Sequence, residues 1–231
     1  MSASPCVSAS ACCHDGRMSP AAPRFTGFGP GLVDLYLGLH EENSREYWLA
    51  HKDVYENDVR APLELLAGEL TPEFGEPKVF RPNRDLRFSA DKRPYKEQAS
   101  LVVGDGAGVL YAQVSADGLR VAGGWWQPSR EQLAAFRLAV DDGEPGDALD
   151  QVLAELDAAG LPLATGSALK TAPRGWPKDH PRIELLRLTA LTVGVAHPPR
   201  AWLHTRECLS RIVDHWRGVQ RWNAYLGELP G

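Results

Sequence analysis

One block in the middle of the chain carries apolar residues with the two-residue period of β-strands, and helical periods lie on both sides of it. Apolar runs at residues 101–103, 109–115 and 119–126 predict strands in this block. Asp117-Gly118 separates the last two runs and predicts a tight hairpin turn, because both residue types tolerate positive φ. The strands follow one another without the long crossover that parallel pairing requires. We therefore predict an α+β fold: a single domain built on an antiparallel sheet meander, flanked by N-terminal and C-terminal helices.

The segment before this block predicts two helices. Apolar residues recur at i, i+3, i+4 and i+7 over residues 32–39, which is the spacing of one face of an amphipathic helix. Asn43 followed by Glu46 has the spacing of a capping box and predicts the start of a second helix, which runs to about Leu70. Pro62 falls inside this second helix and removes a backbone hydrogen bond, so we expect a kink or a break there.

The segment after the block predicts three more helices and one more strand. Ser129 with Gln132 forms another capping box, and Asp147 opens a further helix that ends at Gly160. Residues 188–195 alternate enough to predict a strand. A long C-terminal helix follows from apolar residues at helical spacing, namely Leu209, Ile212, Val213, Trp216, Val219 and Leu226.

The length and charge of the chain limit its class. A chain of 231 residues suits one large domain, and we assign residues 25–228 to it, with a disordered tail at residues 1–24. No apolar run approaches the ~20 residues of a membrane span, and the N-terminal stretch lacks the apolar core of a secretion signal. We therefore expect a cytoplasmic protein without membrane contact. The net charge of -5 disfavours bulk binding to nucleic acid.

The four cysteines predict neither a disulfide framework nor a metal site. Cys6, Cys12 and Cys13 lie in the tail, and Cys208 is the fourth. Cys12 and Cys13 adjoin His14, but no second pair of ligands follows at the spacing of a zinc site. We expect no structural metal, and the sequence indicates neither a cofactor nor an oligomeric state.

The segment over residues 81–96 is basic, although the chain as a whole is acidic. It contains six basic residues and only two acidic ones, Asp85 and Asp91. Guanidinium groups bind carboxylate and phosphate in a bidentate manner, so several that converge hold a small anion. The two aspartates would orient the arginines. We expect a small phosphate or carboxylate ligand, bound by Arg81, Arg84, Arg87, Asp91, Lys92, Lys96 and, from a later loop, Arg174.

The same segment predicts a strand over residues 79–89, and Pro82 places that strand at an edge or a bulge of the sheet. In a regular strand, Arg81 and Arg87 would share one polar face. Arg84 would fall on the apolar face, where it needs a carboxylate partner or a bulge that turns it outward.

Two other interpretations remain open for the basic segment. In the first alternative, the segment is a structural network of arginine–aspartate pairs or a docking face for a partner protein. In the second it contacts single-stranded nucleic acid together with nearby aromatic side chains, although the acidic total charge disfavours this.

If the site is catalytic, the candidates for proton transfer are Asp85, Tyr95 and His180. His180 and Arg174 lie in a loop over residues 170–181 that is rich in Pro and Gly, and this loop is equally well explained as a rigid connector.

A second wall of the site is predicted on the helix that begins near Asn43. Arg45, Trp48 and Lys52 share one face there, with His51 beside them. The alternative is a core helix anchored by its tryptophan. Convergence of these groups and the loop over residues 170–181 around one pocket with the basic segment would favour a binding site.

The basic segment reads R-x-x-R-D-x-R-F-x-x-D-K-x-P-Y-K and resembles the signature of a bacterial family known as domain of unknown function 2461. Further stretches are similar to the same family: Phe25-x-Gly27-Phe28, Asn43 to Lys52, Gly124-Trp125 and Lys170 to Pro181. The resemblance implies an uncharacterised family to which no reaction, ligand or cofactor is assigned. Thr189 stands where similar proteins usually have a lysine, which implies an altered site if that lysine belongs to it.

Overall fold

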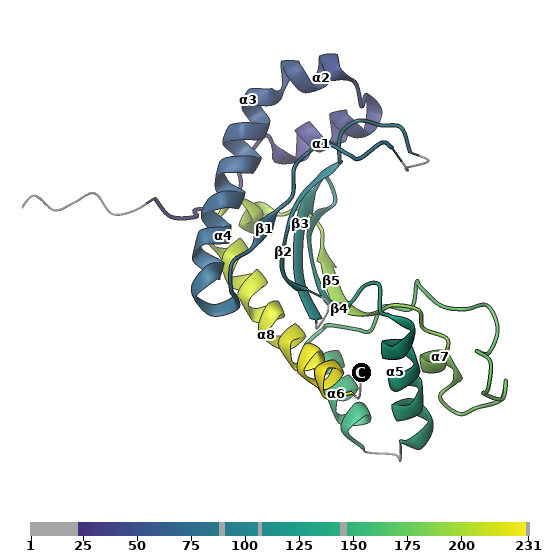
Figure 1. Cartoon of the computed structure of the whole chain (residues 1–231). Helices are drawn as coiled ribbons and strands as arrows, with labels where there is room; N and C mark the ends of the chain where they lie inside the picture. The colour runs from purple at the N-terminus through teal and green to yellow at the C-terminus, as the bar shows by residue number, and fades with distance from the viewer. Residues whose placement is uncertain (1–22, 88–90, 106–107, 144–146, 230–231) are drawn as a thin grey trace, which may run out of the picture.

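The computed structural model describes residues 23–87, 91–105, 108–143 and 147–229, and its sheet pairs five antiparallel strands in chain order (Figure 1). Ser115 pairs with Gly118, so Ala116 and Asp117 form the tip of the hairpin, one residue earlier than predicted. The predicted meander is confirmed. The strands are β1 (Lys78–Val79), β2 (Gln98–Asp105), β3 (Gly108–Ser115), β4 (Gly118–Trp125) and β5 (Leu191–His197).

Helical segments precede the sheet. They are α1 (Leu32–Glu41), α2 (Arg45–Ala50), α3 (Lys52–Val54), the π-helical η1 (Tyr55–Arg60) and α4 (Ala61–Phe74). The expected break in the second helix is therefore spread over two places. One lies at His51, between α2 and α3, and the other is the π-helical turn that precedes Pro62 in the first turn of α4.

The cap predicted for the second helix is wrong by one residue. Ser44 is the N-cap of α2, because its Oγ accepts a hydrogen bond of 3.0 Å from the backbone N–H of Tyr47. Asn43 is committed elsewhere: its Oδ1 accepts from the backbone N–H of Tyr95 at 2.9 Å, and its Nδ2 donates to the Tyr95 carbonyl at 3.1 Å. A side chain held in this way does not reach the start of α2.

Three of the remaining helical segments agree with the sequence pattern, and the two short ones, at residues 183–186 and 201–204, were not predicted. Ser129 and Gln132 form the predicted capping box, and Asp147 caps the next helix by accepting from the backbone N–H of Asp150 at 3.0 Å. The elements are α5 (Arg130–Asp142), α6 (Ala148–Ala158), α7 (Ile183–Leu186), the 3-10 helix η2 (Ala201–His204) and α8 (Glu207–Glu228).

The long helix α8 covers one face of the sheet, and α4 lies beside it (Figure 1). Its buried indoles tie it to the strands: Trp216 donates to the carbonyl of Tyr111 at 3.2 Å, and Trp222 donates to that of Leu191 at 2.9 Å. The strand residues that alternate toward α8, such as Leu101 and Val121, are fully buried. The opposite face of the sheet looks onto the space between the residue 80–97 loop and α5 (Figure 1).

The basic segment is not a regular strand, so this prediction is wrong beyond Val79. After β1 the chain forms an irregular loop over residues 80–97, here called the basic loop, in which Asn83 and Tyr95 make one isolated antiparallel pair. Pro82 and Pro94 have no N–H to donate to a strand ladder, and each accepts one backbone hydrogen bond from across the loop instead. Residues 88–90 of the loop lie outside the described residues.

Some predictions concern residues that the structure does not describe. The tail predicted at residues 1–24 lies outside the described residues except for residues 23 and 24, and so do Cys12, Cys13 and His14. Within the described ranges, no helix combines the length and the apolar character that crossing a membrane requires.

Candidate functional site

A groove of about 600 Å³ lies on the sheet face opposite α8. Its walls combine aromatic, apolar and polar side chains from four strands and from the chain that flanks them. They include Phe80, Tyr111, Gln113, Arg120, Trp126 and Thr192. A concave site of this size, largely apolar with a few polar groups, is the usual form of a small-molecule binding site.

Strand register explains why these side chains meet. Gln113 on β3 pairs with Ser100 on β2 and with Arg120 on β4, and directly paired residues point to the same face of a sheet. Two residues along β3, Tyr111 belongs to the same face, and its hydroxyl donates to Gln113 Oε1 at 2.8 Å. Trp126 follows β4 with 63% of its surface exposed, which leaves its indole accessible at one end of the groove.

Two arginines of the basic loop are paired with carboxylates inside it. Arg84 forms an ion pair with Asp91, lies 3.9 Å from Glu97, and donates from Nε to the carbonyl of Tyr95 at 2.9 Å. Arg93 bonds both Asp91 and Glu97. The guanidinium groups hold the pKa of Asp91 well below its usual range, with Arg93 as the largest cause. These contacts close the loop on itself.

The outer part of the basic loop is paired locally. Arg87 contacts Asp85, two residues before it, through Nη2–Oδ2 at 2.6 Å and Nε–Oδ1 at 3.0 Å. This contact lowers the pKa of Asp85. Lys92 donates to the carbonyl of Leu86 at 3.1 Å. Arg87 and Lys92 are exposed, and neither lines the groove.

Lys96 and Arg81 differ from the paired arginines, because among the described residues no carboxylate lies within ion-pair distance of either. The Nζ of Lys96 lies 4.9 Å from the ring centre of Phe80, which lines the groove. Burial lowers the pKa of Lys96, and the charges of Arg81 and Arg84 lower it further. Neither Lys96 nor Arg81 lines the groove itself, but Lys96 adds positive charge beside Phe80 at its edge, and Arg81 also acts on Asp85, whose pKa it lowers.

Tyr95 faces the N-terminal helices rather than the groove. Its ring is buried and stacks on Trp48 of α2 with centroids 4.5 Å apart. The structure thus joins α2 to the basic loop through a packed aromatic pair, and no residue of α2 lines the groove. His51 stacks on Tyr47 and its Nδ1 lies 2.9 Å from the Tyr47 carbonyl, so its ring packs back on α2.

Arg174 and His180 lie at the other edge of the sheet from the basic loop. The loop that carries them precedes β5, whereas the basic loop joins β1 and β2, and the two lie far apart in Figure 1. His180 Nε2 lies 3.1 Å from Asp141 Oδ1 on α5, and Arg174 is exposed. Thr189 donates its backbone N–H to the carbonyl of Ser167 near the same edge. The predicted residues therefore do not all converge on one pocket.

Sequence reasoning missed the groove residues on β3 and β4. A signal was present, because Tyr111, Gln113 and Arg120 break the apolar pattern at alternate positions of their strands. Such residues also suit a solvent-exposed sheet face, and the pattern alone does not show that they line a groove. Among the described residues, no group of three His, Cys, Asp or Glu side chains is placed to hold a metal ion.

Comparison with known proteins adds a family but no activity. The family model of a conserved hypothetical protein, DUF2461, matches residues 32–225. No curated protein matches the chain. The residues matched by the family model include the sheet, the basic loop, the groove and nearly all of α8. The chain belongs to the DUF2461 family of conserved hypothetical proteins.

Proposed function

We propose that the protein binds a small molecule that carries a phosphate or carboxylate group on a flat apolar body, and that it does so in the groove on the open face of the sheet. The anionic group lies at Lys96 and Arg81, and the apolar body lies along Tyr111 toward Trp126. Arg120 on β4 is a further cation for polar groups of the ligand, and no described carboxylate pairs with it.

Lys96 is the observation that carries this proposal. It is partly buried, it lies over the Phe80 ring at the groove, and burial and the charges of Arg81 and Arg84 lower its pKa. A partly buried cation among other cations is an unfavourable arrangement for the protein alone. A bound anion would relieve it through charge-assisted hydrogen bonds, and Lys96 lies over Phe80, which lines the groove.

The contacts of the basic loop also support the structural alternative for part of the signature. Arg84, Arg87 and Arg93 are engaged by carboxylates of the loop itself. We assign these pairs the task of fixing the loop, so that Lys96 and Arg81 are held beside Phe80 at the edge of the groove. In this account the ion-pair network and the binding site are parts of one arrangement rather than rival explanations.

The test is calorimetry at low salt with phenyl phosphate, inorganic phosphate and phenol as probes. We expect phenyl phosphate to bind more tightly than either part alone, because it engages both the cations and the aromatic wall. Lys96→Gln should weaken phenyl phosphate by about tenfold or more, as expected when a charged hydrogen bond worth ~1.5–3 kcal/mol is lost.

The matched control is Lys178→Gln, which removes the same charge from an exposed position in the loop at the opposite edge. It should leave the affinity unchanged. Equal affinity for phenyl phosphate in Lys96→Gln and in the parent protein would refute the proposed site. An equal loss of phenyl phosphate affinity in both variants would mean that the effect comes from the total charge of the protein and not from this site.

A further inference from the structure

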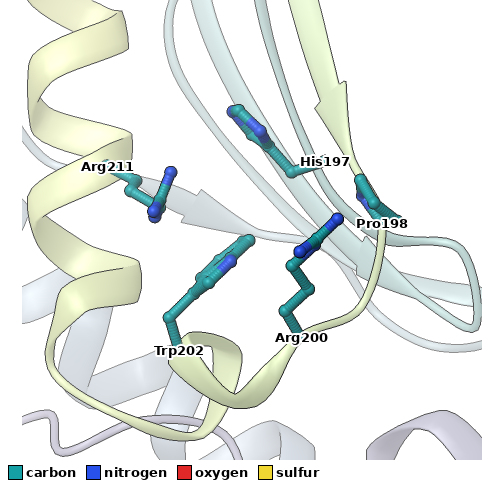
Figure 2. Close-up of a pocket in the computed structure, with 5 residues that line it drawn as sticks. All are labelled: His197, Pro198, Arg200, Trp202 and Arg211. Atoms are coloured by element: carbon teal, nitrogen blue, oxygen red, sulfur yellow. The ribbon is translucent and has the colours of Figure 1, made fainter.

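A second basic pocket lies on the other side of the sheet, where β5 ends and α8 begins (Figure 2). It has a volume of about 420 Å³ and is lined by His197, Pro198, Arg200, Trp202 and Arg211. His197 pairs with Leu119, whose buried side chain belongs to the face covered by α8. This pocket therefore shares no lining residue and no sheet face with the groove.

The two arginines of the pocket differ in their partners. Arg211 contacts Glu207 one turn before it on α8, with Nη2–Oε1 at 2.6 Å, and its guanidinium lies 4.7 Å from the ring centre of Trp202. Arg200 is exposed, and among the described residues no carboxylate pairs with it. Figure 2 shows the Arg211 guanidinium on one side of the Trp202 ring and the Arg200 guanidinium on the other, with the His197 ring above them.

A pair of histidines lies at the wall of this pocket. His197 Nε2 and His215 Nε2 are 2.8 Å apart, and the two rings stack with centroids 5.0 Å apart. Such a contact requires one nitrogen to donate and the other to accept, so the two imidazoles are not both protonated while it lasts. Burial is the largest cause that lowers the pKa of each ring, and the charge of Arg211 lowers both further.

The charges around the pair leave it in a positive environment. Among the described residues, the charges that shift the pKa of the rings are Arg211, which acts on both, and Asp214, which acts on His215; Glu207 on the same helix pairs with Arg211. Glu207 is bonded to Arg211, and Asp214 lies 3.8 Å from Arg217, so each carboxylate has an arginine of its own. Asp214 partly offsets the lowering of the pKa of His215. An anion in the pocket would add the negative charge that both rings lack.

We propose that this pocket binds a tetrahedral oxyanion, such as a phosphate group, between Arg200, Arg211 and His197, and that binding draws a proton onto the pair His197–His215. Binding linked to proton uptake strengthens as the pH falls, by at most about tenfold per pH unit for one proton. The bound group belongs to free phosphate or to a phosphate monoester. Only the monoester carries a substituent, which would project out of the pocket.

Sulfate is the probe for the proton linkage, because its charge stays constant between about pH 5.5 and pH 8, where histidine titrates. The experiment is a sulfate titration by calorimetry at several pH values and low salt, in the Lys96→Gln background, so that the groove does not contribute. We expect sulfate affinity to rise several-fold on going from about pH 7.5 to about pH 6. Repeating the titration in buffers of different ionisation enthalpy should show proton uptake.

Variants separate the two halves of the proposal. Arg200→Gln, at an exposed position, should lower sulfate affinity at every pH, whereas Arg130→Gln, an equally exposed arginine on α5, should not. His215→Asn should keep sulfate binding and weaken its pH dependence, because only one of the two rings then remains to take up a proton. Inorganic phosphate and glycerol phosphate compared at one pH distinguish the two sources.

Two outcomes would overturn the proposal. Undetectable sulfate binding at about 10 mM and low pH, where even a millimolar site is filled, would exclude the site. An unchanged sulfate affinity in Arg200→Gln would exclude this pocket as the site. A sulfate affinity of the parent protein that does not depend on pH would exclude the proton linkage. Each result is independent of phenyl phosphate binding at the groove.

Discussion

Asn43 fastens the basic loop to the N-terminal helices, and its replacement by alanine should loosen both. Its side chain bonds both backbone polar groups of Tyr95: Oδ1 accepts from the N–H, and Nδ2 donates to the carbonyl. The same Nδ2 lies 3.1 Å from the carbonyl of Leu39 in the last turn of α1. One side chain thus joins α1 to the residue next to Lys96.

The magnitude follows from these contacts. Asn43→Ala removes three hydrogen bonds, each worth ~1 kcal/mol net, so their sum is about 3 kcal/mol. The Tyr95 carbonyl keeps its bond from Arg84, which reduces the loss. The backbone N–H of Tyr95 loses its partner at a partly buried position, which adds to it. We therefore expect the free energy of unfolding to fall by about 2–3 kcal/mol.

Urea unfolding followed by tryptophan fluorescence measures this change, and Asn57→Ala is the matched control. Asn57 is exposed in the π-helical segment, so alanine there should change stability by less than about 0.5 kcal/mol. The affinity for phenyl phosphate should fall with Asn43→Ala, because Lys96 loses its fixed position. A loss of less than about 0.5 kcal/mol for Asn43→Ala would refute the role of this side chain as the fastening of the loop.

Further predictions concern histidine and cysteine. The pKa of both His197 and His215 is lowered in the folded protein, so the unfolded chain binds more protons below its own histidine pKa of about 6.5. The free energy of unfolding should therefore decrease from about pH 7 to about pH 5, and His215→Asn should flatten this dependence; equal slopes in urea unfolding would contradict it. Burial raises the pKa of the Cys208 thiol to about 12, so iodoacetamide should leave Cys208 unmodified in the native protein. Peptide mass spectrometry checks this, and rapid alkylation of Cys208 would show that the start of α8 opens.

The sheet and the outer helices could be predicted from the sequence because their signals are local. Alternating apolar residues over 109–115 specify a half-buried strand, and the helical spacing around Trp216 and Val219 specifies one buried face of α8. These patterns depend only on neighbours along the chain. The capping box at Ser129 is local in the same sense, and it was found at the predicted residues.

The basic loop could not be predicted because its geometry depends on contacts across it. Residues 79–89 alternate like a strand, but Arg84 reaches Asp91 and the carbonyl of Tyr95 instead of extending along the sheet. Asn43 has the sequence context of a helix cap, yet its partner lies 52 residues away. A local pattern does not contain such partners.

The groove has the same limitation. Tyr111, Gln113 and Arg120 meet only because the register of β3 and β4 places them on one face, and because no helix in the described part of the chain covers that face. The sequence identified Lys96 and Arg81 as members of a basic segment. It did not distinguish them from Arg84 and Arg87, which the structure pairs with carboxylates.

The most direct test of the central claim is the titration of the Lys96 ammonium group by NMR, with and without phenyl phosphate. In the free protein, the pKa of Lys96 should lie below the ordinary lysine value of about 10.4, because burial and the neighbouring arginines disfavour its charge. Bound phenyl phosphate should raise that pKa, since its phosphate stabilises the charged form. A pKa of Lys96 that phenyl phosphate leaves unchanged, at concentrations that saturate its binding, would contradict an anion site at the groove.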